Sequence, residues 1–305
     1  TQRLYFQNIQ QTLAWNVAAE LMARPSWIRG NYPREFFHSD SLLESLRLIK
    51  SPEEVNYIRK AIKITYYAML SVMPLLQRGA LEAEIAAALE YHFRAFGAET
   101  AFPSIVAAGA SAAILHYEKQ NRALQRGSMV LFDCGAQWQG YAADLSRVFP
   151  VSGRFSAPQR ELYQVVLAAH SAAIKKIKPG ASITSIHNAA AFALTQGLID
   201  LGVLRGKASR LFAKRAFEPY FPHNIGHSLG LDVHDIGDLR WKSETVLKKG
   251  MVLTIEPGLY FSRKTAAFPP CGVRIEDDVF VTSTGCEVLS RAVPKQPDDI
   301  EAMMS

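Results

Sequence analysis

The sequence predicts an α/β (α+β) fold made of two related halves. Helix-like and strand-like segments follow one another in the same order twice, and glycine and acidic residues recur at matching distances in both copies. The 305 residues, of which 49% are hydrophobic, are enough to bury a large core. We therefore expect a duplicated domain whose functional residues lie where the halves meet.

The composition is ordinary for a soluble globular enzyme. The net charge of +6 is spread over short clusters such as Lys175–Lys178, which predicts a solvated basic surface rather than a nucleic-acid partner. No stretch approaches 18 apolar residues and no basic-then-apolar signal opens the chain, so no membrane association is expected. The cysteines have no paired spacing, which indicates a reducing, cytoplasmic location; they are Cys134, Cys271 and Cys286.

Residues 1–48 are expected to form a short helical segment and a connector. Apolar residues recur there at four-residue spacing and predict one apolar helix face, until Pro25 breaks the pattern. These residues are Ile9, Leu13, Val17 and Leu21. A second unit, residues 49–305, is expected to begin just after them.

The second unit opens with a clear helix start. Ser51 has the features of an N-cap, Pro52 suits the first turn, and the acids that follow suit the positive end of a helix. Apolar residues at spacings of three and four from Val55 to Met73 predict an amphipathic helix. A second helix through Leu89 should stop at Gly97, and strands are expected over 129–133 and 142–151.

The same order of elements then recurs. Ser156–Pro158 should open a helix that ends at Pro179–Gly180, and another helix is expected over 183–199. Strand-like runs follow at 251–256 and 273–282. This repetition is the first sign of an internal duplication.

The two halves align without gaps around their acidic residues. In each half a glycine stands six residues before an acid and another glycine two residues after it, and a second acid stands nine residues before a glycine. The matched residues are Gly127, Asp133, Gly135, Asp144 and Gly153, and Gly250, Glu256, Gly258, Glu276 and Gly285. Four carboxylates that converge at a pseudo-twofold site would repel one another unless cations lay between them.

The expected cations are divalent. Carboxylate oxygens suit hard ions, and four carboxylates with one imidazole suit a pair of Mn²⁺, Co²⁺ or Zn²⁺ ions. The imidazole is expected from His223, His227 or His234, which fall within twelve residues and have Gly226 and Gly230 among them. Spacing alone leaves open which histidine binds metal.

Four motifs resemble the signature of the methionine aminopeptidase/prolidase superfamily. They are Phe132–Asp133 with Asp144, His223–His227, Thr254–Gly258 and Gly272–Asp277. Further details resemble its aminopeptidase P branch, namely Ile114–Tyr117, Leu229–Asp235, Glu256–Tyr260 and Val293–Met303. The resemblance covers about residues 48–300 and implies the pita-bread fold, with a curved antiparallel sheet and helices on its outer face.

The resemblance also implies a site. Asp133 would chelate one metal ion, His227 and Glu256 the other, and Asp144 and Glu276 would bridge both, with a hydroxide between the ions. Glu256 would in addition move the proton of the attacking water. The outer residues would be His116, His223 and His234 at the substrate, with Arg274 and Tyr260 orienting carboxylates and solvent.

The implied activity is hydrolysis of the peptide bond before a proline at the second position, with Mn²⁺ as the first choice of metal. The alternatives are an Xaa-Pro dipeptidase (prolidase) and a catalytically silent pita-bread binding module. The filled ligand positions argue against the silent module, and equally against a metal-free hydrolase of the creatinase type. Relatives carry a full N-terminal domain that walls the substrate cleft and builds oligomers; residues 1–48 resemble its remnant, and a homo-oligomer is one implied assembly.

Overall fold

The structure, a computed structural model, describes residues 3–6, 16, 20, 23, 35–38, 40–240, 243 and 245–304. The chain divides into two units, Thr1–Arg47 and Leu48–Ser305. In the first unit β1 (Arg3–Phe6) pairs in parallel with β2 (Glu35–His38), and α2 (Asp40–Arg47) follows. The helix expected from Ile9 to Leu21 lies outside the described residues. The assignment of residues 1–48 to a remnant domain stays a prediction.

The first helices of the second unit begin where the sequence predicts. α3 (Pro52–Gln77) starts with a capping box: the Ser51 N–H donates to Glu54 Oε2 at 2.7 Å, and the Glu54 N–H donates to Ser51 Oγ at 3.3 Å. α4 (Glu82–Ala95) follows and ends just before Gly97, which has a positive φ. Both helices bury their apolar faces, including Ile58 and Leu89.

The strands of the first half form two small antiparallel sheets. β5 (Met129–Cys134) pairs on one side with β4 (Ile105–Ala108) and on the other with β8 (Leu145–Pro150). A 3₁₀ helix, η1 (Gly109–Ala113), follows β4. The second sheet contains β3 (Glu99–Thr100), β6 (Ala136–Trp138) and β7 (Tyr141–Ala142).

The second half repeats this plan. α5 (Ala157–Ile174), α6 (Ile183–Asp200) and the short α7 (Ala208–Ala213) are followed by strands. β12 (Asp277–Val281) pairs with β9 (Val252–Ile255) and β13 (Cys286–Val288), while β10 (Gly258–Phe261) pairs with β11 (Cys271–Arg274). α8 (Pro297–Met303) ends the described chain. Thus each half has a helix pair and a central antiparallel strand pair, β5–β8 or β9–β12.

Three predicted boundaries are wrong. α5 ends at Ile174 rather than Pro179, because i→i−3 bonds from the N–H groups of Lys176 and Ile177 tighten the chain into a turn. The strand predicted over 142–151 is interrupted at 143–144, where the Asp144 N–H donates to the side chain of Asp278. The strand predicted over 273–282 is divided at 275–276, because the backbone changes partner from β10 to β9.

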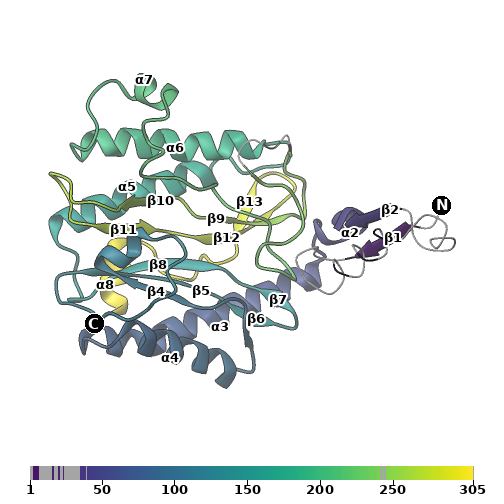
Figure 1. Cartoon of the computed structure of the whole chain (residues 1–305), viewed down its shortest axis with the longest axis horizontal. Helices are drawn as coiled ribbons and strands as arrows, with labels where there is room; N and C mark the ends of the chain where they lie inside the picture. The colour runs from purple at the N-terminus through teal and green to yellow at the C-terminus, as the bar shows by residue number, and fades with distance from the viewer. Residues whose placement is uncertain are drawn as a thin grey trace. The chain divides into compact units, whose positions relative to one another are not determined.

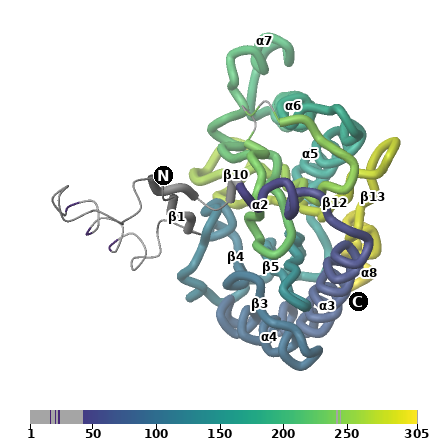
Figure 2. The backbone as a smooth tube through the Cα atoms, turned by 90° about the vertical axis from the view of Figure 1, so that its right-hand side faces the viewer, coloured from purple at the N-terminus to yellow at the C-terminus, as the bar shows by residue number. Residues whose placement is uncertain are grey.

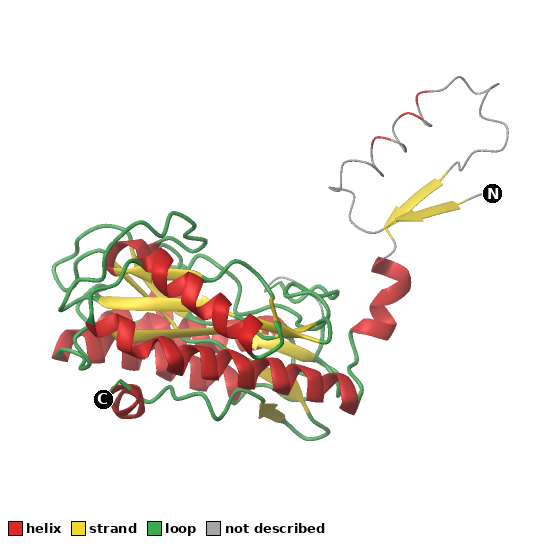
Figure 3. Cartoon of the chain, turned by 90° about the horizontal axis from the view of Figure 1, so that it is seen from below, coloured by secondary structure: helices red, strands yellow, loops and turns green. Residues whose placement is uncertain are grey.

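The strands of the second unit lie between the two helix pairs. Figure 1 shows α5 and α6 along one side of them and α3 and α4 along the other. In Figure 3 the long helices lie against the strands, and loops gather on the opposite side. Near the C-terminus, α8 lies beside α3 (Figure 2), and Gln77 Nε2 donates to the Met304 carbonyl at 2.6 Å. Among the helices that the structure describes, none combines the length and apolar character needed to cross a bilayer.

Candidate metal centre

Four carboxylates lie where strands end or are interrupted. Asp133 is the penultimate residue of β5, and Asp144 occupies the gap before β8. Glu256 follows β9 directly, and Glu276 lies in the gap between β11 and β12. The two interruptions that the sequence did not predict are therefore the positions of Asp144 and Glu276. At both, the backbone leaves the regular strand pairing: the Asp144 N–H donates to Asp278 Oδ2 at 3.2 Å, and the Glu276 N–H donates to the Ser146 carbonyl at 3.1 Å.

The loop that carries His227 is fixed against β9. The His227 N–H donates to Thr254 Oγ1 at 3.1 Å, and the Thr254 N–H donates to the His227 carbonyl at 2.9 Å. This contact requires glycine beside the histidine, because a Cβ at Gly226 would lie 1.9 Å from the Thr254 carbonyl oxygen. Gly226 therefore allows the backbone of the His227 loop to lie directly against the backbone of β9.

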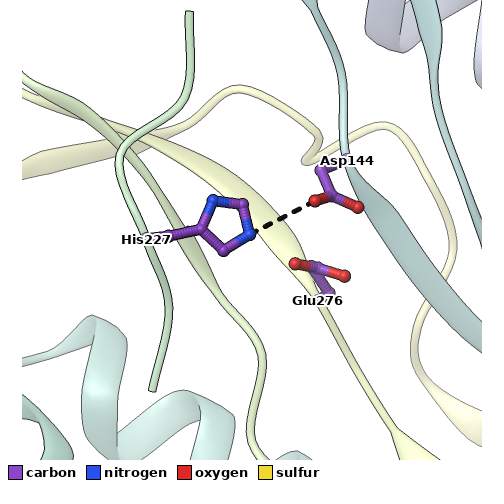
Figure 4. A group of neighbouring side chains, drawn as sticks. All are labelled: Asp144, His227 and Glu276. Carbon is purple, nitrogen blue, oxygen red and sulfur yellow. Dashed lines mark ion pairs between the residues drawn. The ribbon is translucent and has the colours of Figure 1, made fainter. Parts of the chain in front are cut away.

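The side chains of Asp144, His227 and Glu276 point toward one another (Figure 4). Their ligand atoms all lie within 4.8 Å of one another. His227 Nε2 is 3.3 Å from Asp144 Oδ2 and 3.7 Å from Glu256 Oε1. Residues from both halves of the domain thus form one cluster.

His227 presents a bare nitrogen to this cluster. Its Nδ1 lies 3.1 Å from the Ser228 carbonyl, which only accepts hydrogen bonds, so Nδ1 carries the proton. Burial, with the nearby charge of His234, lowers the pKa of His227 to about 4, so the ring is neutral at neutral pH. A neutral imidazole with an unprotonated Nε2 is the form that binds a metal ion.

The carboxyl groups are held in conditions that favour a cation. Burial, with the charges of neighbouring carboxylates, raises the pKa of Asp144 and of Glu276 well above the ordinary range. Burial likewise raises the pKa of Glu256 to about 8. Asp133 Oδ1 and Asp144 Oδ1 are buried without a hydrogen-bond partner. Crowded carboxylates, unpaired buried oxygens and a bare imidazole nitrogen form a donor set that fits divalent metal ions.

Arg274 connects three of the predicted residues. It donates from Nη2 to Asp133 Oδ2 at 2.5 Å and from Nη1 to the Tyr260 hydroxyl at 3.0 Å. Its Nε donates to Ser146 Oγ at 2.8 Å, and Ser146 in turn donates to Glu276 Oε2 at 2.7 Å. Both arginine and tyrosine are buried. One guanidinium therefore orients carboxylates from both halves.

The three outer histidines differ in their surroundings. His223 Nδ1 donates to the Asn224 carbonyl at 2.8 Å, so its Nε2 accepts from the Tyr260 hydroxyl at 2.9 Å. Burial, with the charge of Arg274, lowers the pKa of His223 to about 3. His234 is exposed, with its ring centroid 4.2 Å from that of His227. His116 is also exposed, on the loop after η1, and lines a surface pocket of about 410 Å³.

Sequence analysis missed two residues of this site, Ser146 and Asp278. Ser146 links Arg274 to Glu276, and Asp278 Oδ2 accepts the N–H of Asp144 at 3.2 Å. Each stands two residues after a predicted carboxylate, which is the spacing that keeps extended residues on one face. That spacing was the available signal.

The site has the donor set of a divalent-metal centre, and the comparison with known families shows which family the chain belongs to. Residues 56–283 match metallopeptidase family M24, and the chain belongs to this family. It is 40% identical to the Xaa-Pro aminopeptidase of Haemophilus influenzae over 268 residues, which are 87% of this chain and 62% of that protein. It is 36% identical to the Xaa-Pro aminopeptidase of Escherichia coli over 293 residues, 95% of this chain and 66% of that protein. The chain thus spans slightly less than two thirds of these relatives.

Solved structures agree as well. Aminopeptidase PepP of Pseudomonas aeruginosa superposes with a TM-score of 0.89 at 39% identity, over 99% of this chain and 71% of that one. Aminopeptidase P of E. coli in complex with the inhibitor Pro-Leu gives a TM-score of 0.88 at 34% identity, over 99% and 70% of the two chains. The predicted pita-bread fold is confirmed by this likeness.

Proposed function

We propose that the chain is a two-metal aminopeptidase that removes the first residue of peptides with proline in second place. The observation that carries the proposal is the cluster of Asp144, His227 and Glu276, which both halves of the domain build. The proposed substrate class is taken from relatives of the chain that are named Xaa-Pro aminopeptidase.

In this proposal Asp133 would hold one ion, His227 and Glu256 would hold the other, and Asp144 and Glu276 would serve both. When bound, two such ions make water nucleophilic at neutral pH and polarise a carbonyl oxygen. Mn²⁺ is the proposed metal, because carboxylate oxygens dominate the donor set. Co²⁺ and Zn²⁺ are the other candidates, and direct loading of the protein with each ion distinguishes them.

The chain's own residues would move the proton and bind the substrate. Glu256 lies beside both His223 and His227, with Oε2 3.7 Å from His223 Nδ1, which places a carboxylate at the site that could take and return a proton. The Tyr260 hydroxyl accepts from Arg274 and donates to His223 Nε2, and this chain ends on the Asn224 carbonyl, so it would hold His223 and Tyr260 in place beside Glu256. His116 and His234, both exposed, would contact the proline and the peptide beyond it.

A cytoplasmic location is proposed because the three cysteines are free thiols, as in a reducing compartment. A homo-oligomer remains a proposal from the family resemblance.

The deciding experiment is a mass-spectrometric substrate panel with Mn²⁺ present. We expect release of the first residue from Xaa-Pro-Yaa tripeptides and longer peptides, and poor turnover of Xaa-Pro dipeptides. Preference for the dipeptide would indicate a prolidase, and preference for Met-Ala-Yaa would indicate a methionine aminopeptidase.

Asp144→Ala is the matched variant, and we expect it to lose metal and most activity. Full activity in this variant would refute the two-metal mechanism. A protein that binds metal and cleaves nothing would indicate a binding module.

A further inference from the structure

A buried ion pair lies beside the metal centre and outside the residues assigned to it. Lys50 Nζ donates to Asp235 Oδ2 at 2.9 Å, and each side chain is 1% exposed. Lys50 precedes α3, and Asp235 follows His234 in the histidine loop. Lysine and aspartate are almost never fully buried unless paired, and a buried pair is a poor source of net stability. Such a pair therefore points to a role in holding a particular geometry.

Hydrogen bonds connect this pair to the metal cluster. The Asp235 N–H donates to the Ser228 carbonyl at 2.9 Å. The same carbonyl accepts the Nδ1 proton of His227 at 3.1 Å. The Ser228 carbonyl thus favours the Nδ1-protonated form of His227, and Asp235 helps to fix that carbonyl. His227 Nε2 then lies 3.3 Å from Asp144 Oδ2.

The loop closes tightly around the pair. A Cβ at Gly230 would lie 2.1 Å from Asp235 Oδ2 and 2.8 Å from Lys50 Cε. The Lys50 backbone is fixed independently, because its N–H donates to the Gly250 carbonyl at 2.8 Å. Asp235 Oδ1 accepts the N–H of Ile236 at 2.8 Å, so both carboxylate oxygens are used. The lysine is held by the body of the domain, and the aspartate by the loop.

We propose that Lys50 and Asp235 are positioning residues that hold the histidine loop. In this position His227 Nε2 faces the metal cluster, and the ring of His234 lies against the ring of His227. The proposal rests on the proposed function for the roles of the two histidines. The pair would raise the affinity for one ion, the ion that His227 would hold, and would not act through overall stability alone.

The test measures metal binding in Asp235→Asn and in the charge-free double variant Lys50→Met/Asp235→Leu. Calorimetric titration with Mn²⁺ gives the affinities, and the visible spectrum of the Co²⁺-loaded protein reports the geometry at His227. Loss of an outer-shell partner typically weakens metal binding by about 10–100-fold. We expect the affinity to fall by that factor in only one of the two binding steps, and this should be the step that His227→Ala abolishes. The spectrum of the Co²⁺-loaded variants should also differ from that of wild type. In metal-free protein, ¹⁵N NMR should show a larger Nε2-protonated population of His227.

The control is Arg59→Met, which breaks an exposed ion pair with Glu287 on another part of the domain and should leave both binding steps unchanged. The double variant separates positioning from stability, since it leaves no unpaired charge. If it is folded and melts like wild type but binds metal weakly, positioning is supported. If it, or a folded Asp235→Asn variant, keeps wild-type affinity and spectrum, the proposal is wrong. Wild-type protein that shows these metal effects but cleaves no Xaa-Pro peptide would refute the proposed function alone.

Discussion

At the scale of single residues, Glu256 combines two tasks that a substitution can separate. It lies directly after β9, with one oxygen near His227 and the other near His223. Glu256→Gln keeps an oxygen that can bind a cation but cannot carry a proton. Since general acid–base work is typically worth about 10²–10⁴-fold, we expect kcat on an Xaa-Pro-Yaa peptide to fall by that factor.

Metal content should fall much less, and atomic absorption on the same preparation measures it. Glu287→Gln is the control, because this carboxylate is exposed and lies on β13. Loss of metal in proportion to loss of rate would remove the proton-transfer role from Glu256.

Residue types and spacing predicted much of the candidate site, for an identifiable reason. Carboxylates at matched positions of a duplication must meet at its pseudo-twofold axis, so Asp144 and Glu276 could be paired by their places in the two repeats. Ser146 was signalled only by its place two residues after Asp144, and Lys50 was not signalled at all, because a serine or lysine carries no chemical signature of its own. Their significance comes from which atoms they meet: Glu276 Oε2 in one case and Asp235 Oδ2 in the other.

At the scale of elements, helix starts were predictable and strand ends were not. Ser51 and Ser156 open α3 and α5 with capping boxes, which are local patterns of side chain and backbone. The division between β11 and β12 arises when the backbone leaves β10 for β9, which is a tertiary event without a local signal. The sequence therefore predicted continuous strands where the site needs interrupted ones.

Arg147 on β8 illustrates how these interruptions are stabilised. The buried guanidinium donates from Nε to the Pro294 carbonyl, from Nη1 to the carbonyls of Ser146 and Glu276, and from Nη2 to Asp277 Oδ1 and the Val293 carbonyl. A guanidinium has five N–H donors, and all five are used. The segment before α8 is thus joined to the backbone of a predicted metal ligand.

We expect Arg147→Lys to destabilise the domain although it keeps the charge. An ammonium has three donors, so at least two buried acceptors lose their partners at about 1–3 kcal/mol each. Urea unfolding should show a free energy of unfolding lowered by roughly 2–6 kcal/mol. Lys295→Met, which removes one partly exposed contact with Asp277, should cost less. A variant with the wild-type urea midpoint would show that the five bonds carry no net stability.

At the scale of the whole molecule, stability should depend on acid through His187 of α6. This ring is 2% exposed and stacks on Phe221 with centroids 5.3 Å apart. Burial, with the charge of Arg215, lowers its pKa from 6.5 to about 4. The folded protein therefore resists protonation of this ring. Its contribution to stability is complete above pH 6.5 and is lost as the pH falls toward 4.

His187→Phe keeps the aromatic contact and removes the proton. Between pH 7 and pH 4 we expect wild type to lose up to about 3 kcal/mol more of its free energy of unfolding than the variant, at 1.36 kcal/mol for each pKa unit. Parallel urea titrations of both proteins across that range measure the difference. Identical pH dependence in the two would mean that His187 is protonated without cost.

The hydrogen bond from Ser146 to Glu276 spans 130 residues and joins the two halves at the candidate site. Ions held between Asp144 and Glu276 would act there as reversible cross-links that close a very long loop. A chelator would then do more than stop a reaction: it would remove one of the links between the repeats. Metal supply in the cell would in that way set how long each molecule survives proteolysis as well as how fast it works.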